Sequence, residues 1–137
     1  MGKALGIDFG TKRTGIAITD AMQIIATGLT TVATHTLDDF ISNLLQKETI
    51  ECFVVGDPKN LDGTATDSTA YVNAFVKRTK QRYPEIPIHQ IDERFTSKIA
   101  KKSILESGVR KKVRQNKALV DQVSAVIILQ NYLDYKS

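Results

Sequence analysis

Three acidic residues stand where the sequence predicts hydrophobic elements. Asp8 ends an apolar strand-like segment, Glu93 follows a second one, and Asp121 lies just inside the last predicted helix. An isolated carboxylate inside a protein is strongly disfavoured unless something neutralises it. Three carboxylates that point into one fold therefore call for a shared cation. This pattern predicts a metal-dependent nuclease that cleaves phosphodiester bonds.

The chain has 137 residues, about the length of one domain, and we expect residues 1–137 to form a single unit. Lysine and arginine outnumber aspartate and glutamate by 19 to 15, and this net charge of +4 is concentrated in one segment. That segment holds a single acid, Glu106, among Arg94, Lys98, Lys101, Lys102, Arg110, Lys111, Lys112, Arg114 and Lys117. It favours a polyanionic partner, although a solvated helix face explains the charges equally well.

Cys52 is the single cysteine, and it lies in an apolar run. It has no partner for an internal disulfide, so we interpret it as a small buried hydrophobic residue in a reducing compartment. No stretch has the length and apolar character of a membrane span, and no signal-peptide core follows Met1. We therefore expect a cytoplasmic protein that does not associate with membranes.

The first two predicted strands, Ala4–Phe9 and Gly15–Thr19, form a hairpin. In both strands, large side chains alternate with Ala or Gly, so one face of the hairpin carries large side chains and the other carries small ones. This alternation is expected for central strands that have a layer packed closely against the small face. Residues Ile24 to Val32 are a plausible third antiparallel strand.

A helix is predicted to follow Thr36, which resembles the first residue of a capping box with Asp39 in the reaching-back position. Leu37 begins its apolar stripe. Next, Glu51–Gly56 is a continuous apolar run, typical of a parallel strand covered on both faces. The segment Asp57–Thr64 is dense in turn formers and is predicted to be a surface loop.

A second helix is predicted from about Asp67 to Arg82, and a fifth strand covers Ile88–Asp92. A third helix follows Thr96 or Ser97, a basic connection spans Val109–Asn116, and the last helix runs from about Lys117 to Tyr135. This order predicts an α/β fold with a mixed five-stranded sheet. Its first three strands are antiparallel, the next two are parallel, and helices cover both faces.

Each carboxylate also has a structural interpretation. Asp8 could accept hydrogen bonds from amides of the turn that follows it. Glu93 could form a salt bridge with Arg94, and the sequence does not fix whether Asp92 or Glu93 points into the site. Asp121 could be a first-turn acid favoured by the helix dipole.

Clustered carboxylates are hard oxygen ligands that suit Mg²⁺ or Mn²⁺, and the sequence lacks cysteine and histidine at zinc-binding spacing. His35 and His89 stand alone, and we interpret them as solvated or capping groups. In two-metal hydrolysis, the ions lower the pKa of the attacking water and stabilise the leaving oxygen.

Over nearly its whole length the chain resembles the YqgF/RuvX family of RNase H-fold nucleases, described as Holliday junction resolvases or pre-16S rRNA nucleases. The matching motifs are Gly6-Ile7-Asp8-Phe9-Gly10-Thr11-Lys12-Arg13-Thr14-Gly15, Val54-Val55-Gly56 with Pro58 and Asp62-Gly63-Thr64, Asp92-Glu93-Arg94-Phe95-Thr96-Ser97, and Asp121 followed by Ala125 and Ile128-Leu129-Gln130.

The resemblance implies an RNase H-like sheet and a structured nucleic acid as substrate, either pre-rRNA in 5′-end processing or branched DNA. It implies that Asp8, Glu93 and Asp121 are catalytic metal ligands. The family usually has an apolar residue where this chain has Asp57, which is either a loop-capping residue or an additional site carboxylate. We expect the nucleic acid to contact Lys12, Arg13, Arg94, Lys98, Arg110, Lys111, Lys112, Arg114 and Lys117.

Two functions from other classes compete with this interpretation. The segment Gly6–Thr11 also resembles the first phosphate-binding turn of actin-like and sugar-kinase ATPases, but the chain has no second glycine-rich turn of that kind. A nucleic-acid-binding module without catalysis would need only the basic segment. The sequence also leaves open whether the protein forms a homodimer.

Overall fold

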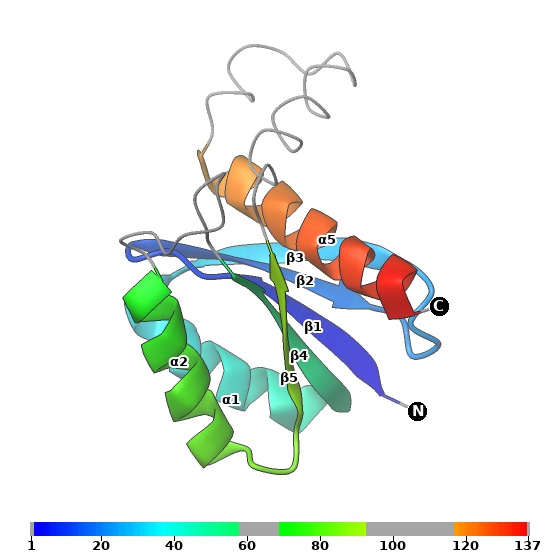
Figure 1. The fold of residues 1–137 in the computed structure, drawn as a ribbon, viewed down its shortest axis with the longest axis horizontal. Helices are drawn as coiled ribbons and strands as arrows, with labels where there is room; N and C mark the ends of the chain where they lie inside the picture. The colour runs from blue at the N-terminus through cyan, green and yellow to red at the C-terminus, as the bar shows by residue number, and fades with distance from the viewer. Residues whose placement is uncertain (1, 58–68, 93–116, 137) are drawn as a thin grey trace.

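The computed structural model describes residues 2–57, 69–92 and 117–136 (Figure 1). The predicted third helix and the basic connection therefore lie outside the described residues. The elements are β1 (Lys3–Asp8), β2 (Arg13–Thr19), β3 (Ala26–Ala33), the short 3₁₀ helix η1 (Thr34–Thr36), α1 (Leu37–Lys47), β4 (Ile50–Asp57), α2 (Thr69–Arg82), β5 (Ile88–Asp92) and α5 (Lys117–Lys136).

The strands form one mixed sheet in the order β3-β2-β1-β4-β5. β1, β2 and β3 are antiparallel neighbours, whereas β4 runs parallel to β1 and β5 runs parallel to β4. α1 and α2 lie on one face of the sheet, and α5 lies across the other (Figure 1). The predicted architecture, including the antiparallel and parallel pairings and the helices on both faces, is confirmed.

The two faces of the sheet pack side chains of different size. On the face towards α1 and α2, buried residues such as Leu5, Ile16 and Phe75 form the larger core. On the face towards α5, Ala4 and Ala17 pack with buried residues of that helix in a smaller core. The predicted division of the hairpin into a large and a small face is therefore correct.

α5 approaches β1 most closely at Gly6. A Cβ atom added to Gly6 would lie 2.9 Å from the Cβ of Leu129 and 3.1 Å from the carbonyl oxygen of Ala125. Because the second of these atoms is helix backbone, no rotamer change relieves the contact. Gly6 thus allows the helix to lie directly on the middle of the sheet.

We predict that Gly6→Ala lowers the free energy of unfolding by about 1–3 kcal/mol, because the added methyl group pushes α5 away from β1. Gly28→Ala is the matched control, since its added Cβ meets the flexible side chain of Gln122, which can move aside. Urea unfolding of both variants measures the difference. Equal stability of the two variants would contradict the close approach.

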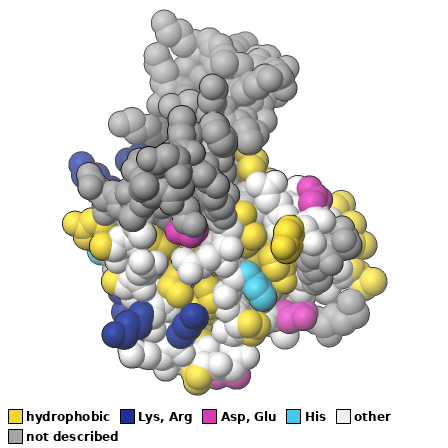
Figure 2. All heavy atoms as spheres, viewed as in Figure 1, with side chains coloured by type: hydrophobic (Ala, Val, Ile, Leu, Met, Phe, Trp, Pro, Cys, Tyr) yellow, Lys and Arg dark blue, Asp and Glu magenta, His cyan; other side chains and the backbone are white. Residues whose placement is uncertain are grey.

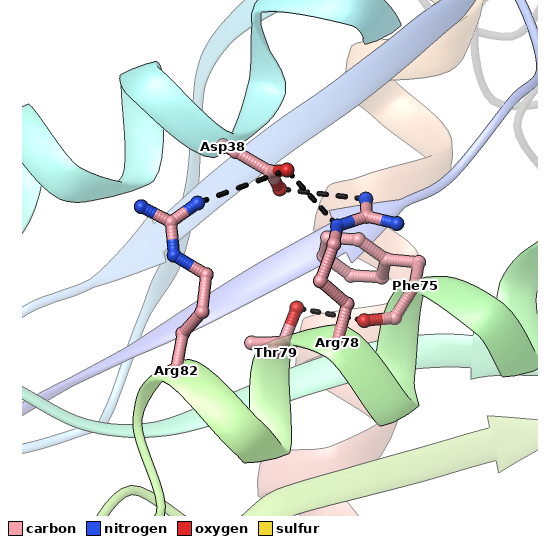
Figure 3. Close-up of polar contacts among 5 residues, drawn as sticks. All are labelled: Asp38, Phe75, Arg78, Thr79 and Arg82. Carbon is pink, nitrogen blue, oxygen red and sulfur yellow. Dashed lines mark hydrogen bonds and ion pairs between the residues drawn. The ribbon is translucent and has the colours of Figure 1, made fainter.

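α1 and α2 are joined at their surface through Asp38 (Figure 3). Its carboxylate accepts hydrogen bonds from Arg78 Nε at 2.9 Å and Nη2 at 3.4 Å, and lies 3.8 Å from Arg82 Nη1. The Arg78 guanidinium also lies 5.6 Å from the ring centre of Phe75. The ion pairs are more than one-third exposed on the arginine side, so they add little to stability and mainly orient the helices.

The predicted capping box at Thr36 is wrong. No side chain caps α1, and the Thr36 hydroxyl instead donates a hydrogen bond to the carbonyl oxygen of Ala33 at 2.7 Å. The 3₁₀ turn η1 leads directly into the helix, so the backbone at Thr36 is already turned before α1 begins. The helix itself is present where its apolar stripe predicted it.

β3 begins at Ala26, two residues later than predicted. The Asp20 carboxylate accepts hydrogen bonds from the amides of Ile24 and Ile25, at 2.8 and 2.9 Å, and this holds both residues in the turn. These bonds lower the pKa of Asp20 below its ordinary value. Gln23 has a φ of 54° in the same turn. The hydrogen bonds to the Asp20 side chain therefore keep Ile24 and Ile25 out of the sheet, although isoleucine favours strands.

Tyr132 connects α5 to β4 through Cys52, which is buried as predicted. The Cys52 Sγ lies 3.7 Å from the tyrosine hydroxyl oxygen. Burial raises the pKa of Tyr132 from 10.0 to about 12, with a smaller contribution from the Cys52 thiol. The native state therefore holds this proton more tightly than the unfolded chain does.

We predict that the raised pKa of Tyr132 lowers the stability of the protein as the pH rises from about 10 to about 12. In that range the native state binds more protons than the unfolded state, so the free energy of unfolding falls with pH. Tyr132→Phe should remove this part of the pH dependence. Denaturant unfolding of both proteins at pH 9 and pH 11 measures it. An identical fall in the two proteins would contradict the assignment.

Candidate active site

Asp8 is the last residue of β1, the central strand of the sheet. It is half-buried and pairs with Gly15 on the neighbouring strand β2. Side chains alternate along a strand, so Asp8 shares a face with Gly6, which is the face that α5 covers. The carboxylate of Asp8 therefore belongs to the side of the sheet where the last helix lies.

Two further aspartates end the strands that run parallel to β1. Asp57 is the last residue of β4 and pairs with Asp92, the last residue of β5. β1, β4 and β5 are parallel, so their C-terminal ends meet at one edge of the sheet, where α/β proteins usually bind ligands. Asp57 belongs to the strand and not to the predicted surface loop, whose remaining residues lie outside the described part of the chain.

Two contacts fix the direction of α5. Near the C-terminal end of the helix, Tyr132 contacts Cys52, which pairs with Ala4 at the start of β1. Earlier in the helix, Ala125 lies against Gly6, which is further along β1. α5 therefore runs antiparallel to β1, in agreement with Figure 1, where the two chain ends lie at the same end of the sheet.

This direction brings Asp121 level with Asp8. Asp121 is one helical turn before Ala125, a rise of about 6 Å, and Asp8 is two strand residues beyond Gly6, a rise of about 6.6 Å. Lys117 begins α5, and the first turn of the helix contains no acidic residue. The alternative that Asp121 is a first-turn acid is therefore wrong. The side chain of Asp121 lies outside the described residues.

The other predicted site residues fall into two groups. Lys12 and Arg13 are exposed and follow Asp8 at the turn into β2. Lys117 is the first residue of α5, and its side chain lies outside the described residues. The residues wholly outside the described part of the chain are Glu93, Arg94, Lys98, Arg110, Lys111, Lys112 and Arg114.

The acids at this edge of the sheet offer carboxylate oxygens, which are the donors that Mg²⁺ and Mn²⁺ prefer. Among the side chains that the structure describes, no three Asp, Glu, His or Cys form a group that could hold a metal ion. The side chains of Asp92, Glu93 and Asp121 are not among them. The donor chemistry at the edge therefore fits a hard cation, and a complete ligand set stays a prediction.

The sequence did not predict an aromatic pair between β5 and the C-terminal half of α5. His89 was expected to be solvated or a capping group, and it is exposed, but its ring also stacks on Tyr132 with 5.0 Å between ring centres. Next to it, a groove of about 410 Å³ is lined by Gln90, Ile91, Asn131 and Tyr135. The one signal in the sequence is the spacing of Asn131 and Tyr135, which puts them on one face of the helix.

Comparison with known proteins agrees with this architecture. The family model described as "RuvX: Holliday junction resolvase" matches residues 2–135. A protein of Bacteroides fragilis is 50% identical over 136 residues and one of Porphyromonas gingivalis is 52% identical over 134, with at least 97% of each chain covered. Both are named "Putative pre-16S rRNA nuclease".

Among solved structures, Thermus thermophilus RuvC in complex with a Holliday junction substrate superposes with a TM-score of 0.60 at 14% identity, covering 100% of this chain and 97% of RuvC. The fold is thus the RuvC-like form of the RNase H-like class. The chain belongs to the RuvX family of nucleases. The predicted family and the predicted enzyme class are both confirmed. None of the helices in the described ranges has the length and apolar run that crossing a membrane requires.

Proposed function

We propose that residues 1–137 act as one cytoplasmic nuclease domain that hydrolyses phosphodiester bonds in the 5′-end processing of pre-16S rRNA. The observation that carries the proposal is the position of Asp8, at the C-terminal edge of the sheet and level with Asp121 on α5. Glu93 directly follows Asp92, which ends β5 at the same edge. These three residues come from distant parts of the sequence.

In this proposal, Asp8, Glu93 and Asp121 hold Mg²⁺ or Mn²⁺. When bound, such ions lower the pKa of the attacking water and stabilise the leaving oxygen of the phosphodiester. β2 fixes the backbone of Asp8 through its pairing with Gly15. Asp57 also ends its strand at this edge, but it alternates with Val55 and so belongs to the face towards α1 and α2, opposite to Asp8.

The choice of RNA over branched DNA rests on the relatives. Proteins about 50% identical to this chain are named for pre-16S rRNA, whereas the RuvC that is seen with a Holliday junction is 14% identical. The family description supports junction resolution as the second candidate. Incubation of the protein with pre-ribosomal RNA and with a four-way DNA junction, each with Mn²⁺ and with chelator, separates the two. Cleavage of the junction alone would contradict the rRNA proposal.

We predict that Asp8→Asn reduces Mg²⁺- or Mn²⁺-dependent cleavage at least about a hundredfold. The amide removes a charged metal ligand, and a loss of several kcal/mol of transition-state stabilisation corresponds to such a decrease. Thermal stability should be kept or increased, because the substitution relieves repulsion between carboxylates. Initial cleavage rates and melting temperatures measure both effects.

Asp39→Asn is the matched control, since Asp39 is exposed on α1, on the opposite face of the sheet. It should cleave at the wild-type rate. If Asp8→Asn also cleaves at that rate, Asp8 is not a metal ligand for the reaction.

We predict that Lys12→Ala weakens nucleic-acid binding and lowers the slope of log K against log salt concentration by about one unit. Lys12 is exposed in the turn that follows Asp8, where it can neutralise one phosphate and release its counterion. Lys80→Ala on α2 is the control with the same charge change and an exposed position on the other face. An unaltered slope in Lys12→Ala would remove this residue from the binding surface.

A further inference from the structure

A groove lies between β5 and the C-terminal half of α5, outside the predicted carboxylate site. Its volume is about 410 Å³, and its lining residues are Gln90, Ile91, Asn131 and Tyr135. The side chain of Tyr135 is 90% exposed, an unusual position for an aromatic ring. Figure 2 shows hydrophobic side chains at the surface of this face, beside the groups coloured as histidine.

The lining of the groove is uncharged at neutral pH. Gln90 and Asn131 carry amides that can both donate and accept hydrogen bonds, and Tyr135 offers a ring face and a hydroxyl. Asp134, the residue before Tyr135, accepts a hydrogen bond from the Gln130 amide at 3.1 Å. A phosphate would find no positive charge among these residues. A flat, neutral ring with polar edges fits them, and a nucleic-acid base is such a group.

The groove lies on the same face of the sheet as the predicted active site, further along α5. Ile91 packs against the smaller core, so it faces the same side of the sheet as Asp8. It is followed directly by Asp92 at the C-terminal edge. β5 is two strands from β1, a separation of about 10 Å. Asn131 and Tyr135 come 10 and 14 residues after Asp121 in α5, a rise of about 15 and 21 Å. A nucleotide chain whose phosphate lies at the carboxylates can therefore reach the groove with a base a few nucleotides away.

We propose that this groove binds an unpaired base of the substrate, a few nucleotides from the phosphodiester bond that is cleaved. Tyr135 stacks on the base, and the amide of Asn131 hydrogen-bonds to its edge. A base held in a duplex is stacked on its neighbours and does not enter. The inference rests on the proposed function, and it makes the substrate single-stranded a few nucleotides from the cleaved bond.

The test is binding of Tyr135→Ala to a fluorescent 12-nucleotide single strand and to the duplex of the same sequence, each as RNA and as DNA, without divalent ions. Stacking of one base on an aromatic ring contributes about 1–3 kcal/mol, so affinity for the single strand should fall roughly 5- to 150-fold. Affinity for the duplex should be unchanged. The salt dependence should also be unchanged, because no phosphate contact is lost.

Tyr135→Phe keeps the ring and should retain most of the affinity. Tyr71→Ala is the matched control, because Tyr71 is 58% exposed but lies on α2, on the other face of the sheet. Replacing one nucleotide of the strand by an abasic site should weaken wild-type binding and have no further effect on Tyr135→Ala.

Equal losses for single strand and duplex, a changed salt slope, or wild-type affinity of Tyr135→Ala would each overturn the proposal. An equal response to RNA and DNA supports base stacking alone, and a loss for RNA only shows that the ribose also contributes. The two proposals can fail separately. If Tyr135→Ala binds like the wild type, cleavage can still depend on Asp8. If Asp8→Asn cleaves at the wild-type rate, the groove can still bind a base.

Discussion

The contact between α5 and β1 at Gly6 is the constraint on which the site depends. Because Gly6 has no Cβ, the helix backbone at Ala125 lies directly against the central strand. The helix then continues for one turn beyond that contact to Asp121, at the level where β1 ends in Asp8. A displaced or rotated helix would keep the sheet intact but separate these two residues. Packing in the small core therefore determines the geometry of the acidic edge.

The edge of the sheet and the groove further along α5 differ in chemistry. Asp8 brings a carboxylate to the end of β1, whereas the groove beside β5 offers an amide and an exposed aromatic ring. The carboxylate suits divalent ions and a phosphodiester group, and the groove suits a base. A nucleic acid presents both groups along one strand. The two surfaces therefore form a consistent account of one substrate strand crossing this face of the sheet.

Local sequence patterns predicted the sheet and the face on which the last helix packs. The alternation of small and large residues around Gly6 was sufficient, because it follows directly from side-chain direction in a strand. The start of β3 was missed because Asp20 bonds to Ile24 and Ile25, and propensity carries no information on such bonds. The groove was missed because Ile91 and Tyr135 meet only through tertiary packing. Asp8, Glu93 and Asp121 were predicted as a set from motifs far apart in the chain, and the set stays a prediction.

The central claim is that distant carboxylates share divalent ions at the C-terminal edge of the sheet. The most direct measurement is a crystal structure of the protein soaked in Mn²⁺, with the ion located by its anomalous scattering. The account predicts a peak at coordination distance, about 2.1–2.2 Å, from the Asp8 carboxylate and from an acid contributed by α5 or the end of β5. A fully occupied Mn²⁺ elsewhere, with Asp8 instead bonded to an arginine or to turn amides, would contradict it.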